Sequence, residues 1–573
     1  YFSIPDLLAL VKASIAAVVA YTVLAFLTTR GEFLPRSVPV LTAIYMIGGL
    51  STIRLAFRLF IERGIWLTGE ARPGLNARKV LLYGFSDKAE SFIRSTHRHS
   101  GQNFDIAGIL DDSDLNIGRY MQGVKVLGSL ADLRSILRTL ARNDVEITEI
   151  IVTEMNSGPR KLAEILEAAT PFSIKVSRIP DLAETSMITT GALITPRPIV
   201  LGDLLERPEV HADIQSVAAL IEGKVVLVTG AGGSIGSELC RQIATFHPKL
   251  FIICDNSEFL LYCLDTELRD QYPELKIVTR IVDVRDAQRI GQLFTELKPE
   301  VVFHAAALKH VPLVEANPLE AVKTNVLGTR NVADAALANG AAGFVMISTD
   351  KAVNPTSVMG ATKRAAEAYC QALDLESTTT RFKTVRFGNV LGSNGSVVPR
   401  FSEQIAAGGP VTVTHPDITR YFMTIPEAVR LVLHASAHAL RRRDQRGKIM
   451  VLDMGKPVRI VDLAERMIQL AGFKPYEDID IIFTGLRPGE KLEEELFDPS
   501  ELQDSAMEDG YWIASPRIAD KVLLQRILTQ IEACSGTEDI ERVIRLLLHM
   551  VPEYRWLGEK RSDTSDHLPV LGT

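Results

Sequence analysis

The sequence is poor in cysteine and has no excess of positive charge, and both deficits limit what the protein can do. Its five cysteines are scattered along 573 residues, and none forms a C-x-x-C pair or a Cys/His cluster with the spacing of metal ligands. We therefore expect reduced thiols in a cytosolic compartment and no metal site. The formal net charge of −7 gives no global electrostatic reason to expect a nucleic-acid partner.

The first 75 residues lack a basic segment ahead of their first apolar run, which argues against a cleaved signal peptide. Residues 7–27 are apolar apart from Lys12 and a few serines and threonines, and residues 37–53 form a second, shorter apolar run. About 20 residues can cross a bilayer, and the arginines that follow the second run favour a cytoplasmic location for that side. We therefore expect a multi-pass helical hairpin in the inner (cytoplasmic) membrane, with the catalytic domains in the cytoplasm. The alternative is a pair of buried core helices, because the second run is short and Lys12 is costly in lipid.

Alternating strand and helix patterns after this region predict two units built on parallel sheets. In the first unit, over residues 76–205, an apolar strand at residues 79–83 ends at Gly84. A dinucleotide fingerprint needs further glycines two and five positions later, whereas this turn carries Ser86 and Ala89. We therefore expect a degenerate Rossmann-like domain with a structural or regulatory role, and not a working NAD site.

The second unit begins with a strand, a glycine-rich turn and a helix. Its glycines are spaced as G-x-x-G-x-x-G, which lets the backbone approach a pyrophosphate at the helix N-terminus. The next strand ends in Asp255, at the usual distance for holding the adenosine ribose hydroxyls, and a carboxylate there favours NAD over NADP. Two further strand ends supply residues beside the adenine and along the cofactor. The cofactor residues predicted in this way are Gly230, Gly233, Ser234, Ile235, Gly236, Asp255, Asp283, Val284, Ala305 and Ala306.

A polar stretch lies at the end of another buried strand, where open α/β sheets bind their ligands. The strand passes into residues 348–351, and a helix carrying Met359 and Lys363 follows. Met359 and Lys363 lie one helical turn apart, but a thioether neither gives nor accepts a proton. Asp350 and Lys351 are therefore the candidates for proton transfer. The alternative is that Asp350 is a turn residue and Lys351 a solvated lysine.

A set of motifs, taken together, resembles the extended short-chain dehydrogenase/reductase superfamily. These motifs are Thr229–Gly236, His304–Val311, Ser348–Lys351, Met359–Lys363, Arg386–Gly392 and Arg487–Lys491. In that superfamily the place of Met359 belongs to a tyrosine. Methionine in this place, together with the adjacent Asp350 and Lys351, narrows the resemblance to the membrane-bound nucleotide-sugar 4,6-dehydratases of bacterial polysaccharide and glycoprotein biosynthesis. The resemblance covers nearly the whole chain and implies an N-terminal membrane region and a degenerate first nucleotide-fold domain.

The resemblance also implies a reaction, with UDP-N-acetylglucosamine as substrate, tightly bound NAD as recycled redox partner and a UDP-4-keto-6-deoxy sugar as product. On this hypothesis C4 is oxidised, water is eliminated across C5 and C6 with Asp350 as acid and Lys351 as base, and hydride returns to C6. Lys363 would hold the nicotinamide ribose, and Thr349 and Ser348 would bind the sugar near C4. In the superfamily, arginines at matching places grip the nucleotide diphosphate. The substrate residues expected here are Lys309, Ser348, Thr349, Asn389, Ser396, Arg420 and Arg487.

The sequence therefore predicts an α/β protein with N-terminal transmembrane helices followed by two Rossmann-like doubly wound parallel-sheet domains, the second with a small C-terminal substrate subdomain. The expected segments are a membrane hairpin and linker at 1–75, the degenerate domain at 76–205, a connector at 206–223, the catalytic domain at 224–505 and a helical tail at 506–573. We also expect a homo-oligomer.

Two rival functions stay open. A nucleotide-sugar 4-epimerase on the same fold would need only C4 oxidation and would be expected to carry tyrosine at position 359. A non-catalytic NAD-binding scaffold of a glycan assembly would bind NAD and leave every UDP-sugar unchanged. The sequence leaves the C5 stereochemistry of the product and the pathway served undetermined.

Overall fold

The computed structural model describes residues 4–29, 35, 37–38, 40–49, 52, 78–98, 104–153, 158–172, 174–180, 196–204, 213–442, 444–498, 501, 510–535 and 539–555. The chain divides into two compact units, residues 1–154 with 179–196 and residues 155–178 with 197–573. The finer segment boundaries expected from the sequence stay predictions.

The membrane hairpin expected over residues 7–53 is contradicted, and with it the inner-membrane location. Helix α1 spans Ile4–Thr29, and residues 40–49 are also helical. Within the described ranges, no helix has both the length and the apolar character that crossing a bilayer requires. The described helical residues 40–49 are fewer than the roughly 20 residues of a membrane span, and α1 includes the charged residue Lys12, which is costly in lipid.

The first sheet has seven strands in the order β3-β4-β2-β1-β5-β6-β7. The strands are β1 (Arg78–Tyr83), β2 (Phe104–Leu110), β3 (Tyr120–Met121), β4 (Val124–Gly128), β5 (Glu149–Val152), β6 (Lys175–Arg178) and β7 (Arg197–Pro198), and the helices beside them are α3 (Asp87–Arg98), α4 (Leu133–Ala141) and α5 (Gly158–Ala169). Strand β1 pairs in parallel with both β2 and β5. Its Val80 and Leu82 are fully buried in one cluster with Phe92 of α3 and Ile109 of β2, which explains the continuous apolar run in the sequence.

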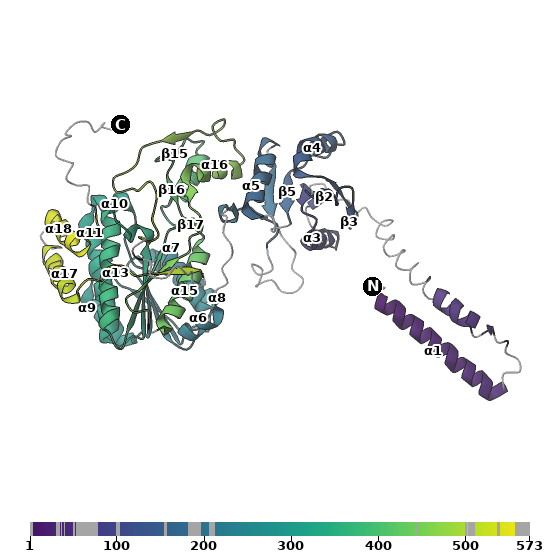
Figure 1. Ribbon diagram of the computed structural model, residues 1–573, viewed down its shortest axis with the longest axis horizontal. Helices are drawn as coiled ribbons and strands as arrows, with labels where there is room; N and C mark the ends of the chain where they lie inside the picture. Colours follow the sequence, from purple (N-terminus) through teal and green to yellow (C-terminus); the bar gives the residue numbers. More distant parts are fainter. Residues whose placement is uncertain are drawn as a thin grey trace. The chain divides into compact units, whose positions relative to one another are not determined.

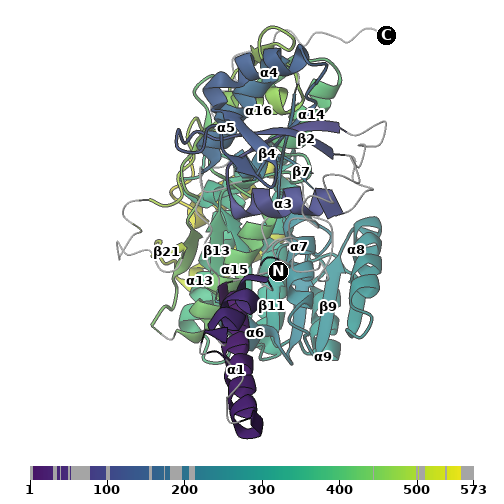
Figure 2. The same ribbon diagram turned by 90° about the vertical axis from the view of Figure 1, so that its right-hand side faces the viewer.

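The second sheet has eight strands in the order β10-β9-β8-β11-β12-β13-β18-β21, and Figure 2 shows them from β9 through β11 and β13 to β21. The strands are β8 (Val225–Thr229), β9 (Leu250–Asp255), β10 (Ile277–Ile281), β11 (Val301–His304), β12 (Gly343–Thr349), β13 (Arg381–Phe387), β18 (Ile449–Leu452) and β21 (Tyr511–Ala514). All neighbours are parallel except β21, which runs antiparallel to β18. The chain order reverses at β8, between β9 and β11, and dinucleotide-binding sheets form their ligand crevice at such a point. The predicted Rossmann-like parallel sheet is confirmed.

Helices cover both faces of this sheet, and its central strands are therefore apolar throughout. The covering helices are α6 (Ile214–Ile221), α7 (Ser234–Ala244), α8 (Glu258–Gln271), α9 (Ala287–Leu297), α10 (Val311–Ala316), α11 (Pro318–Ala321), α12 (Thr329–Ala338), α13 (Val358–Glu376) and α15 (Ile425–Arg441). Figure 1 shows α13 and α15 on opposite sides of the strands. Phe344 and Met346 of β12 pack with α9, α12 and α13, whereas the alternate residues Val345 and Ile347 pack with α7 and α15.

The described part of the expected C-terminal tail belongs to this unit. Strand β21 extends the main sheet, and helices α17 (Lys521–Ser535) and α18 (Ile540–Met550) pack on α13 in a common core. Arg364 of α13 forms an ion pair with Glu553, with Nε 2.9 Å from the carboxylate. These contacts explain why α13 is buried along most of its length.

A small subdomain follows the main run of strands. It contains β14 (Asn389–Val390), α14 (Val397–Ala406), β15 (Val411–Val413), β16 (Thr419–Arg420), β17 (Phe422–Met423), β19 (Val458–Arg459), α16 (Ile460–Leu470) and β20 (Ile481–Phe483). Its own core includes Phe401, Val411, Leu463 and Ile468. The segment after β20 returns toward the end of β12, where Glu494 reaches Lys351.

Candidate active site

The turn between β8 and α7 is so tight that two of its positions accept only glycine. Gly230 has a φ of +68°, and a Cβ there would lie 2.5 Å from the backbone N of Ala306. A Cβ on Gly236 would lie 1.9 Å from the carbonyl oxygen of Gly230. Gly233 is the N-cap of α7 and has no side chain to occupy the first N–H groups of the helix. The turn therefore has the backbone geometry that a pyrophosphate needs.

Asp255 ends β9 beside this turn, and the backbone holds its carboxylate from two sides. Its Oδ2 accepts a hydrogen bond from the N–H of Gly232 at 2.9 Å, and its Oδ1 accepts one from the N–H of Ser257 at 2.8 Å. A carboxylate oxygen accepts more than one hydrogen bond, so both oxygens retain capacity for ribose hydroxyls. The residues present fit an NAD molecule whose pyrophosphate lies on α7.

The other predicted cofactor residues lie at neighbouring strand ends. Asp283 and Val284 follow β10, and Asp283 forms an ion pair with Arg285 at 2.6 Å. Burial alone would raise the pKa of Asp283, but the hydrogen bonds from Arg285 outweigh it and lower that pKa. Ala305 and Ala306 follow β11 and contact the glycine turn. Among the described residues, no group of three or more His, Cys, Asp or Glu side chains is arranged to hold a metal ion.

Asp350 and Lys351 lie directly after β12, in a short helical turn. Asp350 is 1% exposed, and its Oδ1 accepts hydrogen bonds from Thr349 Oγ1 at 2.8 Å and from Lys351 Nζ at 3.0 Å. The same Nζ donates to Asn389 Oδ1 at 2.9 Å and lies 3.3 Å from Glu494 Oε1. Three acceptors around one amine suit an ammonium group.

The charge of Lys351 follows from its neighbours. Burial alone would lower the pKa of Lys351, but the carboxylates of Asp350 and Glu494 outweigh it and raise that pKa above its ordinary value. Lys351 is therefore a cation in the substrate-free protein. Asp350 Oδ2 is buried and has no hydrogen-bond partner within the described part of the chain.

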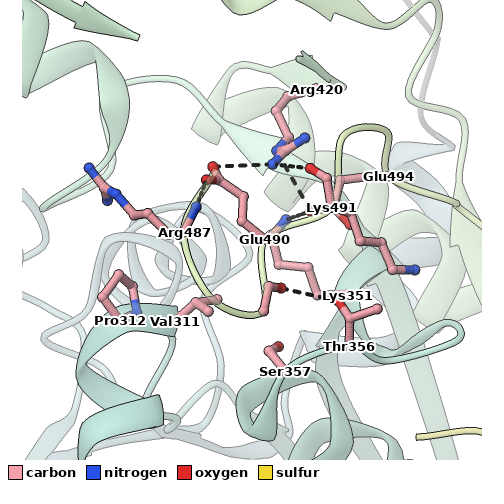
Figure 3. A pocket seen from close by; sticks show the side chains of 11 residues that line it. Val311, Pro312, Lys351, Thr356, Ser357, Arg420, Arg487, Glu490, Lys491 and Glu494 are labelled. Carbon is pink, nitrogen blue, oxygen red and sulfur yellow. Dashed lines mark hydrogen bonds and ion pairs between the residues drawn. The ribbon is translucent and has the colours of Figure 1, made fainter. Parts of the chain in front are cut away.

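A pocket opens beside Lys351, and the segment from Arg487 to Glu494 forms one side of it. Figure 3 shows the guanidinium of Arg420 between Glu490 and Glu494, whereas Arg487 extends to the other side. Arg420 is 6% exposed and donates from Nη1 and Nη2 to the carbonyl oxygens of Thr419, Leu492 and Lys491. Its donors are thus directed at the protein, whereas Arg487 is exposed at the pocket.

Helix α13 carries two of the predicted site residues, Met359 and Lys363, and their surroundings differ. Met359 is 3% exposed in the first turn of α13 and contributes no proton. Lys363 Nζ donates to the carbonyl oxygen of Ile347 at 2.6 Å, and burial lowers the pKa of Lys363 to about 8. Ser348 is buried and donates to Glu367 Oε1 at 2.6 Å, so the structure directs its hydroxyl into the core network.

The loop of residues 389–396 joins the cofactor turn to the substrate side. The N–H of Asn394 donates to Ser234 Oγ, the first residue of α7, at 3.2 Å. Ser396 is the N-cap of α14, and its buried Oγ has no hydrogen-bond partner among the residues that the structure describes. Lys309 lies in the segment after β11, where burial lowers its pKa. Asn389 is the one predicted polar residue of this loop that contacts Lys351.

Glu494 is the site residue that the sequence did not single out. It stands in the run Glu493-Glu494-Glu495, which resembles a solvated stretch of charge, and only Glu494 in that run is buried. Its place three residues after the Arg487–Lys491 motif is the signal that could have found it. The contact with Lys351 depends on tertiary structure and cannot be read from spacing.

Comparison with known proteins assigns this chain to a family. The sequence profile of the family described as polysaccharide biosynthesis protein matches residues 226–516. The chain is 40% identical over 509 residues to the capsular polysaccharide biosynthesis protein CapD of Staphylococcus aureus, covering 88% of this chain and 81% of that protein.

Two further relatives carry different activities in their names. Over 303 residues the chain is 32% identical to a UDP-N-acetylglucosamine 4,6-dehydratase (inverting) of Campylobacter jejuni, covering 52% of this chain and 85% of the relative. Over 298 residues the chain is 34% identical to a UDP-glucose 4-epimerase of Rickettsia akari, covering 50% of this chain and 82% of the relative. The names of these two relatives agree on a UDP-sugar substrate and differ in the reaction.

A solved structure of UDP-glucose 4-epimerase from Thermus thermophilus, in complex with NAD, is similar to part of the chain. It shares 23% identity at a TM-score of 0.39 and covers 48% of this chain and 90% of its own. That structure holds NAD, the cofactor that the sequence predicts for this chain.

Proposed function

Because the chain belongs to the polysaccharide biosynthesis protein family, we propose that it is an NAD-dependent nucleotide-sugar 4,6-dehydratase acting on UDP-N-acetylglucosamine. One observation carries the proposal: Asp350 and Lys351 form an ion pair at the end of β12, whereas the buried Met359 occupies the tyrosine place. Epimerisation needs proton transfer only at the C4 hydroxyl. Elimination of water needs an acid and a base together, and this pair supplies both.

The cofactor side of the site is built by the chain's own backbone and two side chains. The N-terminus of α7 would bind the pyrophosphate, Asp255 the adenosine ribose, and Lys363 the nicotinamide ribose. Bound NAD would supply hydride acceptance from C4 and hydride return to C6. The tight contacts of Gly230 and Gly236 fix the turn on which this binding depends.

Oxidation at C4 would release the hydroxyl proton to solvent, and the proton lost from C5 would be replaced there when hydride returns to C6. The two proton transfers of the elimination itself remain for the side chains. Oxidation at C4 acidifies the C5 proton, and a base must remove it while an acid protonates the departing C6 hydroxyl. Since Lys351 is a cation before substrate binds, we assign the acid to Lys351 and the base to Asp350, through its unpartnered Oδ2. This division is the reverse of the one expected from the sequence, because the sequence did not show the second carboxylate, Glu494, that holds Lys351 in its charged form.

The test is to incubate the purified protein with UDP-N-acetylglucosamine and NAD and to follow the sugar nucleotide by mass spectrometry. A dehydratase yields a product lighter by one water, whereas an epimerase yields a product of unchanged mass. The epimerase is the second candidate because of the similarity to the Rickettsia akari protein. A protein that retains NAD and changes no UDP-sugar would contradict both.

A further inference from the structure

Glu494 is unusual among its neighbours because it is buried. Glu493 and Glu495 are exposed, whereas the side chain of Glu494 is 3% exposed. A buried carboxylate is costly unless cations and hydrogen-bond donors surround it. Its burial in the wall of the pocket therefore calls for partners, and both of its partners belong to the candidate active site.

The two partners are cations that contact the same carboxylate oxygen. Glu494 Oε1 lies 3.3 Å from Lys351 Nζ and 3.6 Å from Arg420 Nε. Its Oε2 is buried and has no hydrogen-bond partner in the described ranges. Glu494 thus links the buried Arg420 to the lysine that we assign as the acid.

Backbone carbonyl oxygens around Arg420 accept hydrogen bonds from its guanidinium group. Its Nη1 donates to the carbonyl oxygen of Thr419 at 2.7 Å, and its Nη2 donates to that of Lys491 at 2.8 Å. Lys491 is itself held, since its Nζ donates to the carbonyl oxygen of Val353, two residues after Lys351, at 2.9 Å. These contacts fix the segment that carries Glu494 relative to the end of β12.

We propose that Glu494 is a positioning residue of this active site, holding the ammonium of Lys351 at the pocket together with Asp350. The proposal rests on the proposed dehydratase function and extends it to a residue outside the recognised motifs. With Asn389 as third acceptor, Glu494 and Asp350 fix the amine in three directions. Loss of the Glu494 charge would leave Nζ with one charged partner and free to turn out of line with the C6 oxygen.

The sign of the electrostatic effect follows from the charges that face Lys351. Asp350 and Glu494 favour its ammonium form, and Arg420 disfavours it. Removing the charge of Glu494 leaves Arg420 without this partner, and the pKa of Lys351 should therefore fall. A carboxylate that lies in the pocket wall without contacting Lys351 in solution would leave the titration of Lys351 unchanged.

Glu494→Gln is the first variant, Glu494→Asp keeps the charge, and Glu493→Gln removes a neighbouring exposed carboxylate as a matched control. Lys351 is acetylated with acetic anhydride over a pH series, and its labelling is quantified by peptide mass spectrometry in the NAD-loaded protein. We expect the labelling midpoint to move to lower pH in Glu494→Gln only. Retention of NAD by each variant shows that it is folded.

The turnover number with UDP-N-acetylglucosamine is measured on the same preparations. We expect Glu494→Gln to lose about 10- to 100-fold, as misplacement of a catalytic group does, and Glu494→Asp to recover part of the loss. The basic limb of the pH profile should also move to lower pH in Glu494→Gln. An unchanged labelling midpoint in Glu494→Gln, or an equal shift in Glu493→Gln, overturns the proposal. The labelling result decides this even if the wild-type protein releases no water from the substrate, an outcome that would overturn the proposed function instead.

Discussion

Replacing Lys351 with methionine should separate the two proton transfers of the proposed elimination. The variant keeps a side chain of similar length but has no proton to give to the C6 oxygen. Loss of a general acid typically lowers the rate by about 10²- to 10⁴-fold, which corresponds to ~2.7 to 5.4 kcal/mol of activation free energy. We expect product formation to fall by this factor while NAD stays bound.

The structure also sets a stability cost for this change. The side chains of Asp350 and Glu494 are 0% and 3% exposed, and Lys351→Met removes the cation that pairs with both. Removing one partner of a fully buried pair costs roughly 3–5 kcal/mol. The Lys351 side chain is 21% exposed, so we expect a smaller cost than this. Lys351→Arg is the matched control: it keeps the charge and hence the stability, but a guanidinium is a poor acid and should not restore elimination.

The assay that distinguishes the acid from the base is exchange at C5 in deuterium oxide, followed by NMR of the recovered substrate. Lys351→Met should still exchange the C5 proton, since Asp350 is intact, although it forms no product. Asp350→Asn should stop both exchange and product formation. The opposite pattern, with exchange lost in Lys351→Met and kept in Asp350→Asn, would refute the assignment and restore the division of roles expected from the sequence.

Three further predictions concern the cofactor site. Asp255→Ala should weaken NAD binding and relax discrimination against NADP, as measured by fluorescence titration with both cofactors; equal affinity of the unmodified protein for the two would contradict the role of Asp255. Gly236→Ala places a Cβ 1.9 Å from the carbonyl oxygen of Gly230 and should abolish NAD retention. The control Gly291→Ala, whose added Cβ has no atom within 4 Å, should retain NAD. The bound NAD is measured after gel filtration. Burial lowers the pKa of Lys363 from its ordinary 10.5 to about 8, and the unfolded chain therefore binds this proton more tightly than the folded one. The free energy of unfolding should rise with pH between these two values, and Lys363→Met should remove that rise in urea denaturation, whereas the exposed-site variant Lys276→Met should keep it.

The cofactor turn could be predicted from the sequence because its determinants are local. The glycine spacing follows from steric contacts within a few residues, and Asp255 contacts the same turn from the end of the next strand. The parallel sheet was equally predictable, since strands covered on both faces are apolar throughout. Asp350 and Lys351 could be located for a related reason, because ligands bind at the carboxyl ends of such strands.

The partners of these residues could not be predicted, because they come from distant parts of the chain. Ser348 donates a hydrogen bond to Glu367, and Arg420 donates hydrogen bonds to the carbonyl oxygens of residues 491 and 492. Both side chains therefore bind the protein itself, whereas the sequence predicted that they bind substrate. Glu494 stands in a charged run and becomes distinguishable only through its burial. The prediction of an N-terminal membrane hairpin was wrong. It gave more weight to the apolar composition of the two runs than to the charges that interrupt them and to the short length of the second run.

The proposed dehydratase differs from an epimerase above all in that hydride taken from C4 of the sugar returns to C6 of the same molecule. The most direct measurement uses UDP-N-acetylglucosamine that carries deuterium at C4, with the purified NAD-loaded protein and the product examined by NMR. We predict a product that has lost one water and carries the deuterium at C6. Deuterium that remains at C4 in a product of unchanged mass would contradict the claim and identify a 4-epimerase.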